Sequence, residues 1–298
     1  MSRLHAMQVF VRVAETGGFA EAARQLNMSP PAVTRAVASL EELIGSRLLT
    51  RTTRTVKLTE PGARYFEDCR RILADIAEAE AAASGSYTTP TGTLSVTASV
   101  LFGNNYIMPI LREFLDANPQ VSGRAIFVDR VVNIVDEGID VAIRIGHLPD
   151  SSYSAIRVGT VRRVVCGSPA YFDRHGVPQH PADLAGHRII ASTGSWSSLD
   201  WRFGKDEKIG VTVTPRLSCS TYEAIVAAAA QGWGLARPLS YQIAAQLESG
   251  SLQTVLSDYE LEPLPVHVVH PEGRRASAKV RAFVDLVVER LRADRHIN

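Results

Sequence analysis

The chain has 298 residues, of which 45% are hydrophobic and 21% are charged, and its formal net charge is +1. This length allows more than one domain, and the composition is that of an ordinary soluble globular protein. The overall charge does not indicate whether the protein has a polyanionic partner. Cys69, Cys166 and Cys219 lack C-x-x-C spacing, so neither a disulfide framework nor a zinc site is expected. No apolar run reaches the roughly 18 residues of a membrane helix and no signal peptide opens the chain, so we expect a cytoplasmic protein without membrane contact.

Charge is distributed unevenly near the N-terminus. Residues 1–58 hold eight lysines and arginines against four acidic residues, whereas residues 59–89 hold three against six. A basic head followed by an acidic segment is typical of a protein that contacts nucleic acid.

Three short helices are predicted in this basic head. Apolar residues recur at helical spacing from Leu4 to Ala14 and from Phe19 to Leu26, with a glycine pair between the two segments. A third helix starts at Ser29, Pro30 and Pro31, because proline fits the first turn and serine can cap the open amides. Its buried stripe is predicted to consist of Val33, Val37, Leu40 and Ile44.

The opposite side of the third helix combines small residues with one long cation, namely Pro31, Thr34, Arg35 and Ala38. Two short helices joined by a tight turn form a helix-turn-helix, whose second helix enters the DNA major groove. Arg35 can donate two hydrogen bonds to guanine, and Thr34 or Pro31 can contact a thymine methyl. The alternative is that Arg35 is only a solvated surface side chain.

Two β-prone runs, Arg47–Thr50 and Thr55–Leu58, predict a winged hairpin after this helix. Arg51 and Arg54 lie near its bend, where they can neutralise phosphates or enter a narrow minor groove. The binding that they supply is expected to weaken steeply as the salt concentration rises.

A longer helix capped by Thr59 is predicted next, followed by the linker-like segment AAASGSYTTPTGT. Its apolar positions follow a coiled-coil spacing of three and four, through Phe66, Cys69, Leu73, Ile76 and Glu80. We expect this seam to join two copies of the head. The alternative is a helix that packs only on its own domain.

From Leu94 onward, apolar strands alternate with helical segments. The predicted strands are TLSVTAS, RAIFV, DVAIRI, RRVVCGS, HRIIAS and VHVVH. The predicted helices are YIMPILREFLDANP, VVNIVDEG, TYEAIVAAAAQGWG and AKVRAFVDLVVERLRA. This alternation predicts α/β architecture with a mostly parallel sheet.

The sequence as a whole resembles the LysR-type transcriptional regulators. The segment FVRVAETGGFAEAARQLNMSPPAVTRAVASLEELIGSRLLTRTTRTVKLTEPG is similar to the DNA-binding end of that family, and PTGTLSV, DVAIRIG, SPAYF, DLAGHRII and AAAAQGWGLA are similar to its effector region. The resemblance implies a winged helix-turn-helix (1–58), a dimerising linker helix and hinge (59–89), and an effector domain (90–298). It further implies that the effector domain has two α/β subdomains like those of a periplasmic binding protein, here 90–162 with 266–298 and 163–265, and that the chains assemble as homodimers or homotetramers.

Carried over position by position, the resemblance implies base or phosphate contacts by Pro31, Thr34 and Arg35, and a wing contact by Arg54. Position 30 is often glutamine in the family, whereas Pro30 can offer only apolar contact. The candidate DNA-binding residues are therefore Ser29, Pro30, Pro31, Thr34, Arg35, Arg51 and Arg54.

Two predicted helix starts in the effector region suit an anion, because the first amides of a helix are open and its dipole is positive there. We expect one side of a small ligand to meet Ser99, Val100 and Leu101, and the other to meet Ser220 and Thr221. Ser99 and Thr221 can instead be plain helix caps. Two further candidates, which can also be purely structural, are Arg144 and His147.

Catalytic motifs such as G-x-x-x-x-G-K-[ST], G-x-S-x-G and H-E-x-x-H are absent from the sequence, so an enzyme is not expected, nor is a metal or cofactor. We expect a transcription regulator that binds an inverted-repeat operator in double-stranded DNA under the control of a small effector. The alternative is a small-molecule binding protein whose head serves only oligomerisation.

Overall fold

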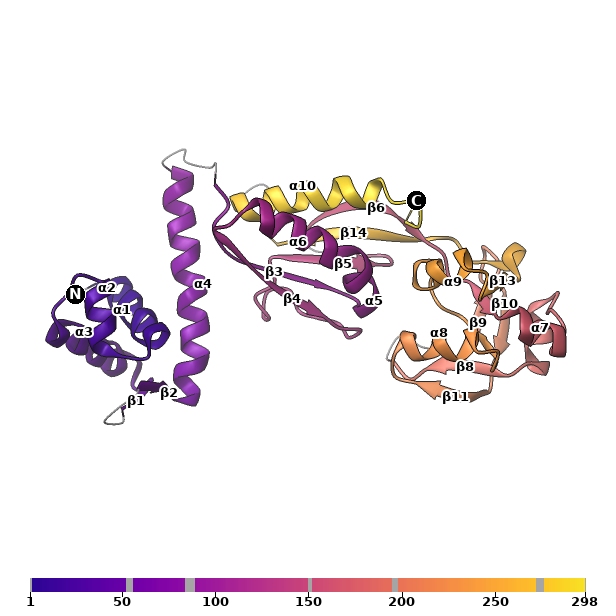
Figure 1. The fold of residues 1–298 in the computed structure, drawn as a ribbon, viewed down its shortest axis with the longest axis horizontal. Helices are drawn as coiled ribbons and strands as arrows, with labels where there is room; N and C mark the ends of the chain where they lie inside the picture. The colour runs from indigo at the N-terminus through magenta and orange to yellow at the C-terminus, as the bar shows by residue number, and fades with distance from the viewer. Residues whose placement is uncertain are drawn as a thin grey trace. The chain divides into compact units, whose positions relative to one another are not determined.

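The structure, a computed structural model, describes residues 2–51, 56–83, 89–149, 152–194, 198–271 and 276–297 (Figure 1). The chain divides into two compact units, Met1–Thr88 and Thr89–Asn298, each described here by itself.

The head contains the three predicted helices, α1 (Arg3–Thr16), α2 (Phe19–Gln25) and α3 (Pro30–Ile44). Helix α1 ends at Gly17, whose φ of 66° lies in the left-handed region that glycine tolerates. Helix α3 starts where predicted, but the Ser29 side chain makes no capping bond, so that detail was wrong. The three helices share one core, which includes Val9, Phe10, Ala22, Val33, Val37 and Leu40.

A short antiparallel hairpin follows, formed by β1 (Leu49–Arg51) and β2 (Val56–Leu58) with Leu49 opposite Leu58. Helix α4 (Glu60–Ala83) starts directly after it, because the Thr59 hydroxyl accepts from the Gly62 amide at 3.0 Å. Gly62 passes so close to the hairpin that a Cβ on it would lie 1.9 Å from the Leu48 carbonyl oxygen.

Helix α4 packs against the core of its own head. Cys69 is fully buried in that core, and Phe66 and Leu73 pack on it. The prediction that Cys69 takes part in an inter-chain seam is therefore wrong, and the own-domain alternative holds for it, whereas a seam through the half-buried Phe66 and Leu73 stays a prediction. The assignment of Ile76 and Glu80 to a seam stays a prediction.

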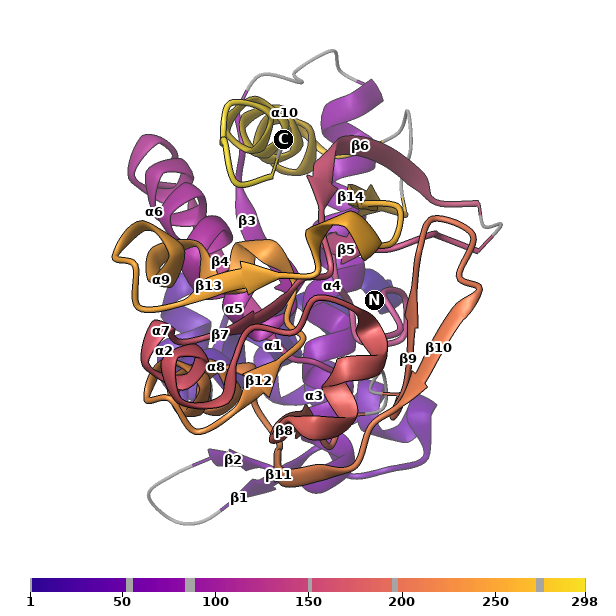
Figure 2. The same ribbon diagram turned by 90° about the vertical axis from the view of Figure 1, so that its right-hand side faces the viewer.

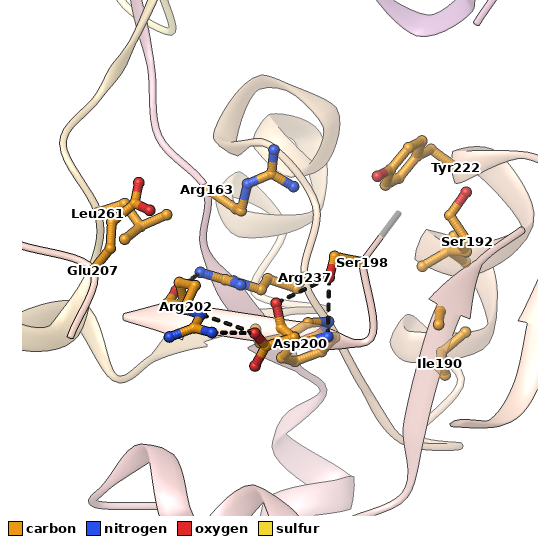
Figure 3. Close-up of a pocket in the computed structure, with 13 residues that line it drawn as sticks. Arg163, Ile190, Ser192, Ser198, Asp200, Arg202, Glu207, Tyr222, Arg237 and Leu261 are labelled. Atoms are coloured by element: carbon orange, nitrogen blue, oxygen red, sulfur yellow. Dashed lines mark hydrogen bonds and ion pairs between the residues drawn. The ribbon is translucent and has the colours of Figure 1, made fainter. Parts of the chain in front are cut away.

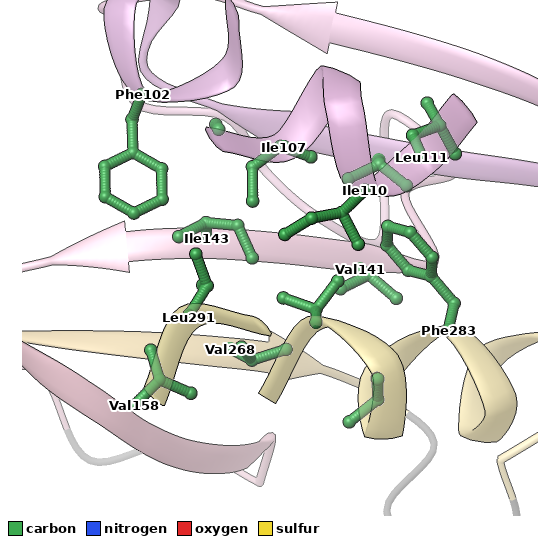
Figure 4. Packing of buried hydrophobic residues seen from close by; sticks show 14 of the residues in the cluster. Phe102, Ile107, Ile110, Leu111, Val141, Ile143, Val158, Val268, Phe283 and Leu291 are labelled. Atoms are coloured by element: carbon green, nitrogen blue, oxygen red, sulfur yellow. The ribbon is translucent and has the colours of Figure 1, made fainter. Parts of the chain in front are cut away.

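The first sheet of the second unit has the order β4-β3-β5-β14-β6. Its strands are β3 (Gly92–Ala98), β4 (Val121–Phe127), β5 (Val141–Ile145), β6 (Ser154–Val161) and β14 (Leu264–His270). Its helical segments are α5 (Val100–Phe102), a π-helical turn (Gly103–Ile107), α6 (Met108–Ala117) and α10 (Ala278–Arg292). Figure 4 shows the core between this sheet and its helices, where Ile110 and Phe283 meet Val141 and Val268.

The second sheet has the order β11-β8-β12-β7-β13, and β9 and β10 form a separate antiparallel ribbon (Figure 2). The strands are β7 (Val165–Gly167), β8 (Ile189–Ser192), β9 (Asp200–Phe203), β10 (Ile209–Thr212), β11 (Pro215–Cys219), β12 (Leu235–Ala236) and β13 (Gln253–Val255). The α-helices are α7 (Pro169–His175), α8 (Tyr222–Ala230) and α9 (Ala244–Glu248), and the 3-10 turns are η2 (Pro181–Gly186), η3 (Ser240–Ile243) and η4 (Ser257–Tyr259).

The α/β class is confirmed, but the sheets are mixed rather than mostly parallel. Strand β3 runs parallel to β4 and β5, whereas β14 is antiparallel to β5 and β6. The second sheet likewise combines parallel and antiparallel pairs. The chain passes from the first sheet to the second after β6 and returns at β14, so the returning strand enters against the direction of its neighbours.

Candidate nucleic-acid interface and effector site

Helix α3 presents the predicted contact face to solvent. Pro30, Pro31, Arg35 and Ala38 are exposed and Thr34 is half-buried, while the opposite stripe of the helix is buried. Burial of that stripe fixes which side of the helix faces outward. The face therefore has the small side chains and the single cation that a helix in a major groove requires.

Arg35 differs from the two arginines of α1 and α2 that lie nearest in sequence. Arg12 pairs with Glu15 at 3.2 Å and Arg24 pairs with Glu21, whereas Arg35 makes no ion pair with any residue that the structure describes. Its guanidinium is thus free to donate to an external acceptor, which is what bidentate guanine contact needs.

The hairpin is held to the helices by backbone contacts. The Glu41 carboxylate accepts from the amides of Leu48 and Leu49 at 2.8 and 3.0 Å, and the Val56 amide donates to the Gly17 carbonyl at 3.3 Å. These bonds fix the wing next to α3. The Arg51 side chain and Arg54 lie outside the described residues.

The predicted anion contacts at the end of β3 are largely occupied. The Val100 amide donates to the Asp129 carboxylate at 3.1 Å, and the Ser99 hydroxyl bonds the Tyr241 hydroxyl at 3.1 Å. Leu101 packs against the core of the first sheet. An anion at the Val100 amide would have to displace Asp129, so this helix start is less suited to an anion than the sequence predicts.

Arg144 takes a structural position. Its guanidinium donates to the Val132 carbonyl at 2.7 Å, and burial lowers its pKa. His147 is exposed. Neither residue lines the cavity described below.

At the start of α8, the Thr221 hydroxyl accepts from the Ala224 amide at 3.4 Å, so Thr221 caps this helix, and its contact with an effector stays a prediction. Ser99 makes no such capping bond. Ser220 is exposed beside the cap, and the next residue along the helix, Tyr222, lines a cavity.

This cavity has a volume of about 220 Å³ and is lined by residues of β8, β9 and α8 together with Arg163, Ser198, Glu207, Arg237 and Leu261 (Figure 3). Aliphatic and indole groups form part of its wall, while hydroxyl and guanidinium groups provide polar contacts. The residues that matter for its chemistry are Arg163, Ser192, Trp201, Tyr222, Ile225 and Arg237.

Arg237 is a cation held in a largely apolar setting. Its guanidinium carbon lies 4.4 Å from the Phe203 ring centre and 5.5 Å from that of Trp201, and it donates to the Arg202 carbonyl. Burial, reinforced by the charge of Arg163, lowers the pKa of Arg237 to about 10, so it stays protonated at neutral pH. Its Nε is buried without a hydrogen-bond partner among the described atoms.

The lining of the cavity has a net charge of +1, because it contains three arginines, Arg163, Arg202 and Arg237, and two carboxylates, Asp200 and Glu207. Asp200 is neutralised by Arg202 at 2.5 Å, whereas within the described ranges neither Arg163 nor Arg237 has a carboxylate within 4.0 Å. Burial raises the pKa of Tyr222, so its hydroxyl keeps its proton and can donate. These residues were not among those predicted from the sequence, although the arginines in VRRVVCG and GLARPLS interrupt apolar runs and could have indicated them.

Two family descriptions match the chain: "Bacterial regulatory helix-turn-helix protein, lysR family" over residues 4–63, and "LysR substrate binding domain" over residues 88–292. The chain belongs to the LysR family of transcriptional regulators.

Similar proteins agree with this membership. An HTH-type transcriptional regulator of Xanthomonas campestris is 35% identical over 292 residues, covering 96% of this chain and 85% of that protein. The structure of CrgA, a LysR-type regulator from Neisseria meningitidis, is 30% identical with a TM-score of 0.62, covering 96% of this chain and 98% of CrgA. Full-length AphB of Vibrio cholerae is 25% identical with a TM-score of 0.61, covering 97% and 99%.

Regulators of this family bind DNA through the helix-turn-helix, bind small effectors through the substrate domain, and form oligomers. Membership in this family confirms the predicted regulatory function and the expectation that the chain is not an enzyme. It favours a DNA-binding regulator over the alternative in which the head serves only oligomerisation. Among the described helices of this LysR-type chain, none is long and apolar enough to cross a membrane.

Proposed function

We propose that this LysR-type regulator responds to a small oxyanion that binds in the cavity beside α8. The observation that carries the proposal is the pair of half-buried guanidiniums, Arg163 and Arg237, which face one cavity without a carboxylate partner among the described residues. A desolvated arginine gains most from a charged acceptor, because charge-assisted hydrogen bonds are roughly twice as strong as neutral ones. The Tyr222 hydroxyl supplies a third donor in the lining of the same cavity.

We propose that α3 of two copies enters successive major grooves of an inverted-repeat operator, with Arg35 donating to a guanine and Thr34 and Pro31 contacting neighbouring bases. Ser29 and Pro30 approach the phosphates or base edges at the helix start. The wing arginines, Arg51 and Arg54, contribute the salt-sensitive part of the affinity.

The division into residues 1–58, 59–89 and 90–298, with subdomains 90–162 plus 266–298 and 163–265, is part of the same proposal, as are a homodimer or homotetramer and a cytoplasmic location. For the dimer contact we propose the side of α4 that carries Ile72 and Ile76. Ile72 is 38% exposed on the isolated chain, and it lies four residues from Ile76 on one helix side.

Two substitution series test the proposal. Arg35→Ala should relax base preference at one operator position by about 1–3 kcal/mol, and Arg35→Lys, which keeps the charge but loses the fork, should do nearly the same. Fluorescence anisotropy with duplexes substituted at each position measures this. A uniform loss over all sequences, recovered by lysine, would mean phosphate contact instead.

The second series tests the effector site. Arg163→Met and Arg237→Met should each abolish the rise in melting temperature that small carboxylates and inorganic phosphate give the wild-type chain. Arg216→Met is the matched control, because Arg216 is exposed on β11 and does not line the cavity. Equal stabilisation in all four proteins would refute the oxyanion site.

A further inference from the structure

The charged side chains that line the cavity fall into two groups. Asp200 accepts from Arg202 Nε at 2.9 Å and from Arg202 Nη2 at 2.5 Å, so these two residues neutralise each other. The other charged residues of the lining are Arg163, Arg237 and Glu207. Within the part of the chain that the structure describes, none of these three forms an ion pair within 4.0 Å. A ligand in the cavity therefore meets two unpaired cations and one unpaired carboxylate.

The two unpaired cations belong to neighbouring segments. The Val164 amide donates to the Pro238 carbonyl at 3.0 Å, and the backbone of Arg163 forms a bridge with Leu239. Burial lowers the pKa of Arg237 and the charge of Arg163 lowers it further, as expected of two guanidiniums that line the same small cavity. A single carboxylate has two oxygens and can accept from both arginines. The arginines therefore form one anion subsite rather than two.

Glu207 is held in the turn between β9 and β10. Its amide donates to the Gly204 carbonyl at 2.9 Å, which closes the turn. The lysines on either side of it, Lys205 and Lys208, each lie near another carboxylate, at 3.9 and 2.7 Å. They therefore leave the charge of Glu207 unneutralised at the edge of the cavity.

The lining provides no cation for a second negative charge. Figure 3 shows Arg163 and Arg237 between Glu207 on one side and Tyr222 and Ser192 on the other. Burial raises the pKa of Tyr222, so on that side the polar groups are neutral hydroxyls. A charged group is unfavourable away from water unless an opposite charge pairs with it. A second carboxylate would thus meet a like charge in one direction and no cation in the other.

We infer that the effector is a small monocarboxylate whose remaining atoms are uncharged, and that Glu207 disfavours molecules with a second carboxylate. This inference rests on the proposed oxyanion site and names its ligand class. A monocarboxylate cancels the net charge of +1 of the lining, whereas a dicarboxylate reverses it. The volume of about 220 Å³ lies below the roughly 300–1,000 Å³ of pockets for drug-sized ligands, and Ile190, Trp201 and Ile225 favour a short apolar body.

The test compares probes in which a second carboxylate replaces a methyl group. Isothermal titration of the full chain at neutral pH and low ionic strength would use pentanoate with glutarate, and 4-methylbenzoate with terephthalate. Wild-type protein should bind at least one monocarboxylate about tenfold or more tightly than its dicarboxylate partner.

A charge-removing variant tests the role of Glu207. In Glu207→Gln, which keeps the shape of the side chain, the preference for the monocarboxylate should fall about threefold or more, chiefly because the dicarboxylate binds more tightly. Glu223→Gln is the matched control, because Glu223 is exposed on α8 and does not line the cavity. It removes the same charge and should leave the preference unchanged.

The outcomes separate this inference from the proposed function. If a dicarboxylate binds wild-type protein at least as tightly as its partner and Arg237→Met abolishes that binding, the oxyanion site stands and the monocarboxylate class is refuted. If Glu207→Gln changes the preference no more than Glu223→Gln does, the role of Glu207 is refuted. If none of the four probes binds, or if binding survives both Arg163→Met and Arg237→Met, the oxyanion proposal fails and this inference fails with it.

Discussion

Replacing Tyr241 by phenylalanine should destabilise the effector unit, because its hydroxyl lies within a directed chain of hydrogen bonds. The Leu239 amide, which can only donate, lies 2.8 Å from one side-chain atom of Gln242 and so identifies that atom as the oxygen. The amide nitrogen of Gln242 then donates to the Tyr241 hydroxyl at 3.4 Å. The Tyr241 hydroxyl, which accepts from Gln242, also bonds the Ser99 hydroxyl, 3.1 Å away.

The cost of Tyr241→Phe follows from burial. Tyr241 is 2% exposed and Gln242 is 9% exposed, so water cannot readily replace the lost partner. The phenyl ring keeps its edge-to-face contact with Phe102, 5.1 Å between ring centres, so the packing contribution stays. The loss is then that of a buried donor without an acceptor, about 2 kcal/mol within the usual range of roughly 1–3 kcal/mol.

A urea titration monitored by tryptophan fluorescence measures this loss, since all three tryptophans of the chain lie in the effector unit. With a urea slope of about 2 kcal/mol per molar, the midpoint should fall by about 1 M. Tyr259→Phe is the control: its ring is only half-buried and its hydroxyl has no described hydrogen bond, so the midpoint should stay within about 0.3 M of wild type. A Tyr241→Phe midpoint equal to that of this control would refute the directed chain.

Two further predictions concern the head and the second sheet. Gly62→Ala should lower the free energy of unfolding by about 3 kcal/mol or more, because the added Cβ would lie 1.9 Å from the Leu48 carbonyl oxygen. Gly18→Ala is the control, since its Cβ would meet nothing within 4 Å. Thermal unfolding followed by circular dichroism compares the two variants, and equal midpoints would refute the clash. Burial lowers the pKa of His187 from its ordinary 6.5, and the neutral ring accepts from the Tyr171 hydroxyl at 3.2 Å. Because the unfolded chain takes up the proton first as pH falls, this stability is complete above pH 6.5 and is lost as pH falls through the lowered pKa of the folded state. His187→Asn should therefore reduce the difference between the urea midpoints at pH 7.5 and pH 5.5.

The elements of the head were predictable because local signals fix them. The glycine after α1 takes a left-handed φ of 66°, and the prolines at the start of α3 permit a helix only from that point onward. The strands of the hairpin were predicted one or two residues too early. Strand β1 covers Leu49–Arg51 rather than Arg47–Thr50, and β2 covers Val56–Leu58 rather than Thr55–Leu58. Strand ends depend on cross-strand pairing, which a single sequence does not display.

The effector unit was less predictable because tertiary contacts decide its local structure. The segment VVNIVDEG has apolar residues at helical spacing, yet it forms turns. Val132 and Ile134 are buried under β5, while Val131 and Val135 are 66% and 55% exposed, so burial follows a period of two rather than 3.6. Strands β12 and β13 have only two and three residues, which is too few to show a period.

The candidate site was only partly predictable for a related reason. Thr221 was predicted from the pattern of a helix start, because capping depends on local sequence, and its neighbour Tyr222 does line the cavity. The same pattern could not reveal Arg163, which follows β6, or Arg237, which follows β12, because the two come together only when β7 pairs with β12 in the second sheet. Nor could that pattern show that the Val100 amide already donates a hydrogen bond to the Asp129 carboxylate.

The error in the linker helix shows what an apolar stripe can and cannot establish. Apolar residues spaced three and four apart indicate that one side of α4 is buried, but they do not indicate whether the covering surface belongs to the same chain. Cys69 and Leu73 lie on the side that its own head covers, whereas Ile72, 38% exposed, is rotated by about 100° from Leu73. Helix α4 therefore has two apolar sides, and a contact with a second chain through Ile72 and Ile76 would not compete with packing on the head.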